Sequence, residues 1–312
     1  MKHCSLWLML LALGIAILTG EASSATTLPQ TAGNFYAGNG ELKEYDANGA
    51  LVQTFAGIIG VYDVAISPKT GNLFASNPAG NLLFEIDANA GGTLNTIANF
   101  QFDGPTNLAF APNERLYITN VGTNFGIQSV LEVLVEHDVL RPIVMRSDIG
   151  LGHLTDPAGI AFDSSGNMFV SSGTSDIVVL DSSFGYSGTL NPAGLLDPGG
   201  IGVAADGLLY VVSQGTSSVL EINPNTGAVL RTFGGMDGPL SDPRNLSVEF
   251  PGLLLVSDAD SGIVGFNLDD GTYQIYPTGG VTGVAAVAPE PCTVALIAVG
   301  LGALAYRRRR KN

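Results

Sequence analysis

Short apolar runs alternate with turn-forming residues along most of the chain, and residues 156–171 show the pattern most clearly. This stretch, DPAGIAFDSSGNMFVS, has a Pro-containing turn, the apolar run 160–162, a Gly-containing reversal and a second apolar run at 168–170. Short β-rich runs bounded by Pro, Asp, Ser, Gly and Asn are typical of a β-hairpin. The stretch therefore predicts two antiparallel strands joined by a tight turn.

The first run of this hairpin recurs at intervals of 44, 52, 41, 45 and 38 residues. The six copies are VAI at 64–66, LAF at 108–110, IAF at 160–162, IGV at 201–203, LSV at 246–248 and VAA at 284–286. Three further apolar runs follow each of the first five copies. The second runs are at 73–76, 116–119, 168–171, 209–212 and 253–256, and the third runs are at 82–87, 130–135, 177–181, 219–223 and 263–267. The fourth runs are at 93–100, 139–145, 186–190, 228–233 and 272–276. Four-stranded units that repeat every 40–50 residues are typical of β-propeller blades.

The two ends of the repeat region complete one another. Residues 34–57 contain a second, a third and a fourth strand (34–38, 42–46 and 50–56) but no first strand, whereas 283–287 is a first strand with nothing after it. A closed ring removes the unpaired edges that two incomplete blades would expose. We therefore predict an all-β, six-bladed β-propeller over residues 26–288, closed by pairing of its N- and C-terminal strands.

Charge makes nucleic acid an unfavourable partner for this region. Residues 26–287 carry seven basic and 26 acidic side chains, a net of −19. Such a surface repels phosphate backbones and attracts cations or basic partners. The region contains no cysteine, so its stability has to come from a packed core rather than from disulfides.

The N-terminus is typical of a secretory signal peptide. Lys2 precedes the apolar segment 6–18, and the small residues Ser23, Ser24 and Ala25 form a cleavage site. We expect removal of residues 1–25. A retained N-terminal membrane anchor is the alternative, although the apolar segment is shorter than a full span.

The C-terminus has three features in fixed order. Pro289, Glu290 and Pro291 are followed by the apolar segment 292–306 and then by Arg307, Arg308, Arg309 and Arg310. This order resembles the PEP-CTERM sorting signal over residues 289–312. The resemblance implies a short transmembrane helix with the Arg cluster on its cytoplasmic side, and an exosortase, a membrane cysteine protease, as partner. It further implies export across the inner membrane, transient anchoring, and a final place at the cell surface or outside the cell in a bacterium that makes extracellular polysaccharide. An ordinary C-terminal anchor is the alternative.

Six equivalent positions at the start of the innermost strands should meet at the central channel. They are Asp63, Asn107, Gly159, Gly200, Asn245 and Gly283. The oxygens of Asp63, Asn107 and Asn245 are of the kind that binds Ca²⁺ or another divalent cation, and Tyr62 beside Asp63 is a candidate for stacking on sugars. The alternative is a polar channel filled by water, because three of the six positions are Gly.

The repeats resemble the NHL family and the gluconolactonase and regucalcin-like propellers, in the DPxGI-like openings and in NPAGN (77–81) and SDADSG (257–262). The resemblance to the gluconolactonase and regucalcin-like propellers implies metal-assisted lactone hydrolysis at the channel mouth, yet no Glu matches that family's ligand.

Asp258, Asp260 and Ser261 are expected to cap a turn rather than to form a calcium loop, since the distal Glu is missing. Asp269, Asp270 and Gly271 are expected to form a hairpin turn.

Other catalytic signals are missing from the sequence. It contains no GxSxG, HExxH, CxxC or Walker motif.

The longest repeat unit has its extra residues at 121–128 and 136–152, close to His137 and His153. Such a loop is either a contact surface or neutral variation. We therefore expect an exported, non-catalytic binding propeller in an exopolysaccharide or biofilm setting, with a polysaccharide or protein ligand. A metal-dependent, lactonase-like hydrolase is the alternative.

Overall fold

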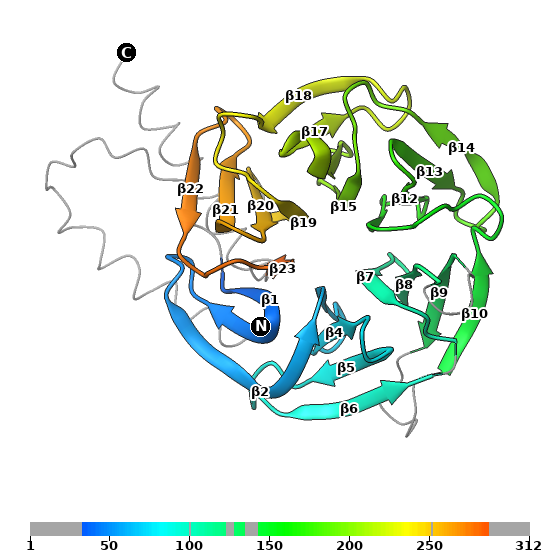
Figure 1. Ribbon diagram of the computed structural model, residues 1–312. Coiled ribbons are helices and arrows are strands. Elements are labelled where there is room, and N and C mark those ends of the chain that lie inside the picture. The colour runs from blue at the N-terminus through cyan, green and yellow to red at the C-terminus, as the bar shows by residue number, and fades with distance from the viewer. Residues whose placement is uncertain (1–32, 100, 123–127, 135–142, 251, 287–312) are drawn as a thin grey trace, which may run out of the picture. The chain divides into compact units, whose positions relative to one another are not determined.

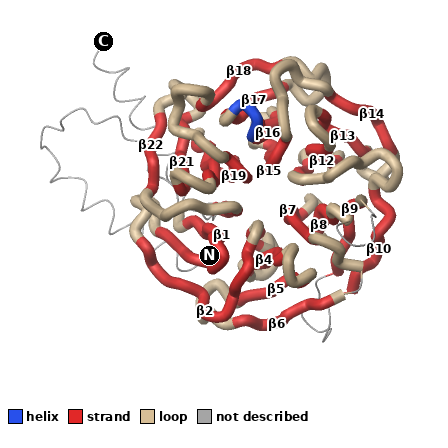
Figure 2. The backbone as a smooth tube through the Cα atoms, viewed as in Figure 1, coloured by secondary structure: helices blue, strands red, loops and turns tan. Residues whose placement is uncertain are grey.

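The computed structural model describes residues 33–286, except 100, 123–127, 135–142 and 251. In the compact unit of residues 28–287, the described chain forms six antiparallel sheets, which surround a common centre (Figure 1). Figure 2 shows strands and loops throughout, and the one helix among the described residues is the 3₁₀ turn η1, Gln214–Thr216. The predicted all-β, six-bladed propeller is therefore confirmed, whereas the predicted signal peptide and sorting tail lie outside the described residues.

Five sheets each come from one continuous stretch of chain, and the sixth joins the two ends of the ring. We number the five as blades in chain order and name the sixth the closing blade. Blade 1 contains β3 (Val64–Ile66), β4 (Leu73–Asn77), β5 (Leu82–Ile86) and β6 (Thr93–Ala98); blade 2 contains β7 (Pro105–Phe110), β8 (Leu116–Asn120), β9 (Ser129–Leu134) and β10 (Ile143–Ile149). Blade 3 contains β11 (Ile160–Phe162), β12 (Met168–Ser172), β13 (Asp176–Leu180) and β14 (Tyr186–Leu190); blade 4 contains β15 (Pro198–Val203), β16 (Leu209–Ser213), β17 (Ser218–Ile222) and β18 (Val229–Gly234). Blade 5 contains β19 (Pro243–Phe250), β20 (Leu253–Asp258), β21 (Gly262–Asn267) and β22 (Tyr273–Tyr276), and the closing blade contains β1 (Phe35–Tyr45), β2 (Leu51–Val61) and β23 (Gly283–Ala286).

The hydrophobic core is divided among the six gaps between neighbouring blades. Blades 1 and 2 share a cluster that includes Phe74, Leu83, Leu116 and Leu131, and each of the other gaps contains a cluster of the same kind. Inner strands are therefore buried on both faces, and every residue of β4, β8, β12, β16 and β20 is buried. This explains why the repeats have continuous apolar runs rather than strict alternation.

The closing blade confirms the predicted pairing of the chain's ends. Phe35 to Gly38 of β1 pair with Ala286 to Gly283 of β23 in antiparallel register, and Figure 1 shows the orange β23 beside the blue β1. The ring is thus completed by strands that lie about as far apart in the sequence as the ring allows.

Strand β1 contains a reversal, so the closing blade also has four strand segments. The rings of Phe35 and Tyr45 stack at 5.4 Å, and Asn34 Nδ2 donates to Glu44 Oε1 at 2.6 Å. Ten residues of extended chain would separate these positions by roughly 33 Å. The chain therefore turns back within β1, near Gly40 with its φ of +66°, as the predicted strands 34–38 and 42–46 require.

Blade 2 departs from the expected boundaries at its outer strand. The sequence predicts a fourth strand at 139–145, but β10 covers Ile143–Ile149, with register shifts around Arg146 before Ile149 pairs with Val130. Ile149 is buried against Leu154 and Ile160 in the core between blades 2 and 3. Burial of this side chain sets the register, which local hydrophobicity does not reveal.

Hydroxyl groups near the ends of the second strands connect neighbouring blades. Four of them each accept a hydrogen bond from an N–H at the start of the first strand of their own blade and donate one to a carbonyl of the next blade. The donated bonds are Ser76 Oγ to Thr106 O (2.5 Å), Thr119 Oγ1 to Ala158 O (2.7 Å), Ser171 Oγ to Gly199 O (2.6 Å) and Ser257 Oγ to Thr282 O (2.9 Å). In the closing blade Thr282 Oγ1 itself donates to Val61 O at 3.3 Å. These bonds fix the inner strands relative to one another around the centre.

Candidate functional site

Asp63, Asn107 and Asn245 meet at the centre of the ring, where the innermost strands begin. Their exposed fractions are 2%, 4% and 5%. Asn245 Nδ2 donates to Asp63 Oδ1 at 2.5 Å, and the side chain of Asn107 also donates a hydrogen bond to Asp63. These buried side chains bind one another, so at this level they do not line an open, water-filled channel.

The hydrogen bonds around Asp63 decide what its carboxylate can do. Asp63 Oδ2 accepts the backbone N–H of Leu108 at 2.8 Å, and the N–H of Val64 donates to the same carboxylate. Asn245 Oδ1 accepts the N–H of Leu246 at 2.8 Å, which fixes the amide with its NH₂ toward Asp63. The carboxylate thus faces N–H donors from four residues.

This donor set does not fit a divalent cation. Ca²⁺ takes six to eight oxygen ligands, whereas the amide of Asn245 turns its nitrogen to Asp63. In the part of the chain that the structure describes, no group of three or more His, Cys, Asp or Glu side chains could hold a metal ion. In this arrangement Asp63 accepts hydrogen bonds from blades 2 and 5 and so connects neighbouring blades.

The glycines of the inner ring are what allow these contacts. A Cβ at Gly283 would lie 2.7 Å from the Cα of Asp63, and one at Gly200 would overlap Oδ1 of Asn245. At Gly159 a Cβ would meet three backbone atoms of blade 4 at 2.6–2.8 Å. Since no side chain at position 283 stands between them, Asn245 of blade 5 reaches Asp63 at the entry to blade 1.

Burial controls the ionisation of this centre. Loss of solvation raises the pKa of Asp63 to about 7, although the hydrogen bonds from Leu108, Val64, Asn245 and Asn107 oppose the shift. Burial likewise raises the pKa of the adjacent Tyr62 phenol, whereas the nearby positive charge of Arg244 lowers it. Tyr62 is half-buried beside these charges rather than a freely exposed stacking platform.

The other sequence candidates have structural roles where they are described. Asp258 accepts the N–H groups of Ser241 and Asp242 through Oδ2, and those of Asp260 and Ser261 through Oδ1, so the predicted turn-capping role is confirmed. Residues 269–271 form the predicted turn between β21 and β22. His153 is exposed and stacks on Tyr186 at 4.1 Å. His137 lies outside the described residues, as do most of the extra residues at 121–128 and part of those at 136–152.

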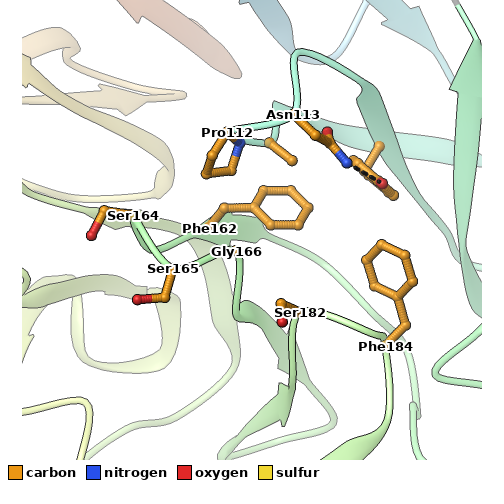
Figure 3. A pocket seen from close by; sticks show the side chains of 10 residues that line it. Pro112, Asn113, Phe162, Ser164, Ser165, Gly166, Ser182 and Phe184 are labelled. Carbon is orange, nitrogen blue, oxygen red and sulfur yellow. Dashed lines mark hydrogen bonds between the residues drawn. The ribbon is translucent and has the colours of Figure 1, made fainter.

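A pocket that the sequence did not predict lies at the opposite end of the ring, where the innermost strands end. It has a volume of about 310 Å³ and is lined by turns of blades 2 and 3. The lining residues are Ala111, Pro112, Asn113, Tyr117, Phe162, Ser164, Ser165, Gly166, Ser182 and Phe184. Figure 3 shows the rings of Phe162 and Phe184 and the three Ser side chains around this hollow. The Tyr117 ring lies 5.0 Å from that of Phe162 and 5.4 Å from that of Phe184.

One sequence signal could have led to this pocket. The turns between third and fourth strands contain a residue at positive φ, which is Gly49, Gly91, Gly227 or Gly271 in four blades but Phe184, with φ of +67°, in blade 3. The turns between first and second strands have Gly71, Gly166 and Gly207 at the matching position, but blade 2 has Glu114 with φ of +64°. Alignment of the repeats by their turns, rather than by their strands, would have singled out both residues.

Comparisons with known proteins agree with the fold. No protein-family model and no curated protein matches the chain. Among solved structures, a chain of a nidogen/laminin complex is 15% identical with a TM-score of 0.66, covering 80% of this chain and 97% of that one. A Bacteroides caccae protein of unknown function is 15% identical with a TM-score of 0.60 (82% and 99% covered), and virginiamycin B lyase from Staphylococcus aureus is 14% identical with a TM-score of 0.54 (80% and 85% covered).

The shared property is the fold. At these identities the similarity supports the propeller fold, whose six blades are seen in the chain's own sheets, and establishes no activity. The NHL and PEP-CTERM resemblances stay predictions, because no family model matches. Among the described residues, none of the helical structure is of the length and apolar character needed to cross a membrane.

Proposed function

We propose that the chain is an exported, non-catalytic binding propeller that acts at the cell surface or outside the cell, in an exopolysaccharide setting. The observation that carries the non-catalytic part is the state of Asp63. Its carboxylate is 2% exposed and accepts hydrogen bonds from the protein's own N–H groups, so it is not poised to bind a catalytic metal or to take a proton from substrate. The lactonase-like alternative would need it free.

The export part of the proposal rests on the sequence. Residues 1–25 have the pattern of a signal peptide, and Pro289, Glu290 and Pro291 precede an apolar segment and four Arg residues. An exosortase-type membrane protease is the proposed partner for this tail. The acidic ring makes nucleic acid an unfavourable ligand. A polysaccharide or a protein is the proposed ligand.

A lactonase assay tests the non-catalytic proposal. The purified full-length protein is incubated with aldonolactones, with added Ca²⁺ or with chelator, beside the Asp63→Asn variant. We expect hydrolysis at the background rate in every arm and the same melting temperature with Ca²⁺ as with chelator. Turnover that chelator abolishes and that Asp63→Asn removes would establish the hydrolase instead.

Fractionation with mass spectrometry of the mature C-terminus tests the sorting proposal. We expect the native protein to end near Pro289 and to appear at the surface or in the medium. A variant with Pro289, Glu290 and Pro291 all replaced by Ala should keep its tail and stay in the membrane fraction. An intact RRRRKN end on the native protein in the inner membrane would exclude sorting.

A further inference from the structure

The pocket between blades 2 and 3 has the chemistry of a small-ligand site. Phe162 and Phe184 are only half-buried, and Ser164, Ser165 and Ser182 are exposed at its edge. Asn113 Nδ2 donates to the Tyr117 hydroxyl at 3.3 Å, as the dashed line in Figure 3 shows. Apolar ring faces with a few hydroxyl and amide groups around them are typical of ligand pockets, and the volume of about 310 Å³ is within their usual range.

Phe184, whose ring lines the pocket, has an unusual backbone conformation. Phe184 has a φ of +67° in a turn whose counterparts in four other blades have Gly at that position. A bulky side chain in this left-handed region is strained, and such outliers concentrate at ligand sites. The neighbouring turn of blade 2 has Glu114 at +64° where three other blades have Gly. Two of the three turns around the pocket thus keep a side chain where the repeat elsewhere has none.

The pocket favours an uncharged ligand. None of the ten lining residues is charged. Two of the three carboxylates in these turns are occupied, because Asp163 accepts the N–H groups of Ser165 and Asn167, and Asp181 those of Ser183 and Gly185. The third, Glu114, is exposed and is not one of the lining residues. Arg115 pairs with the buried Glu132. A charged ligand inside the pocket would therefore lose its hydration without gaining a counter-charge from a lining residue.

From these observations we infer that the pocket binds a neutral hexopyranose unit of a polysaccharide, an inference that rests on the proposed binding function. One face of such a ring carries C–H bonds, which pack on the electron-rich faces of Phe162 and Phe184. Its edge carries hydroxyls that both donate and accept, and the hydroxyls of Ser164, Ser165 and Ser182 do the same. The pocket opens at the ring's surface among exposed turns, so a chain of sugars can continue beyond it.

Calorimetry with defined oligosaccharides tests the site. The probes are neutral hexose oligomers (cellohexaose, maltohexaose and galactohexaose) and the acidic hexagalacturonate, each titrated into the full-length protein. We expect at least one neutral oligomer to bind at least tenfold more tightly than the acidic one. Phe184→Gly should weaken that binding at least tenfold because it removes the ring. Phe184→Asn should do the same, and it is a second variant that tolerates the positive φ.

Tyr186→Ala is the matched control, since Tyr186 is an exposed aromatic residue of the same blade that stacks on His153 outside the pocket. It should bind as the native protein does. Loss of binding in Tyr186→Ala but not in the Phe184 variants would place the site elsewhere. Preference for the acidic oligomer, or binding of none of the neutral ones, would overturn the saccharide assignment. Neither result would touch the non-catalytic proposal, which the lactonase assay decides separately.

Discussion

The two ends of the ring use polar groups in opposite ways. Where the innermost strands begin, Asp63, Asn107 and Asn245 are buried and bind one another. Where those strands end, Ser164, Ser165 and Ser182 are exposed beside half-buried aromatic rings. At the first end the polar side chains hydrogen-bond one another and hold the blades together. At the second end the exposed Ser hydroxyls remain able to bind a ligand. Convergence of polar side chains at a propeller's centre is therefore not by itself a sign of a site.

The largest expected effect concerns the pH dependence that Asp63 imposes. Its pKa is raised to about 7, against about 3.9 in the unfolded chain. Between these values the folded protein holds a proton that the unfolded chain has released, so the free energy of unfolding falls as the pH rises and levels off above about 7. The total change is at most about 4 kcal/mol. Urea unfolding at pH 5 and pH 8 measures the part of this change that lies above pH 5, about 2.7 kcal/mol.

Asp63→Asn should flatten this slope, because the titrating group is gone. The exposed Asp237 provides the control, and Asp237→Asn should keep the native slope. Equal slopes in the native protein and in Asp63→Asn would mean that Asp63 does not titrate in this range.

Gly159→Ala should destabilise the protein by about 3 kcal/mol, since its Cβ would lie 2.6–2.8 Å from backbone atoms of blade 4 that cannot move aside. A Cβ at Gly92 would have no atom within 4 Å, and Gly92 has no positive φ, so Gly92→Ala should cost almost nothing. Thermal unfolding of both variants checks this. A mild effect at Gly159 would show that the inner strands are less closely packed than described.

Ser171→Ala should cost about 2 kcal/mol. The buried hydroxyl donates to Gly199 O and accepts from Gly159 N, both at 2.6 Å, and its removal leaves a buried N–H and a buried carbonyl less satisfied. Ser183 is exposed, and Ser183→Ala should be neutral in the same urea titration. A neutral Ser171→Ala would remove the stabilising role given to the hydroxyl bridges.

The smallest effect on stability is expected at the opposite end. Phe184→Gly relieves the positive-φ strain but loses the ring contact with Tyr117, and the two nearly cancel, so the free energy of unfolding should change by less than about 1 kcal/mol. A melting curve close to native, together with lost saccharide binding, would separate function from folding at this residue. A loss of several kcal/mol would make Phe184 a core residue instead.

The repeat made the architecture predictable because each blade buries both faces of its inner strands, which forces an apolar run at every strand. The pairing of 35–38 with 283–286 followed from counting strands. The convergence of Asp63 with Asn107 and Asn245 followed from their equivalent positions. The mutual hydrogen bonds of these three residues could not be predicted from the sequence, since they depend on the missing side chain at Gly283 and on the orientation of the Asn245 amide. The pocket could not be predicted either, because its lining comes from three turns that are separated in the sequence.

The closing blade also has a consequence for synthesis. Its β23 strand is made last, whereas its β1 partner is made first, so a nascent chain has an open sheet edge until residues 283–286 have left the ribosome. The ring cannot close before β23 has been made. This order is compatible with secretion of an extended chain and closure of the ring after export. A protease that cut after Pro289 would leave the finished ring whole, and one that cut before residue 283 would reopen it.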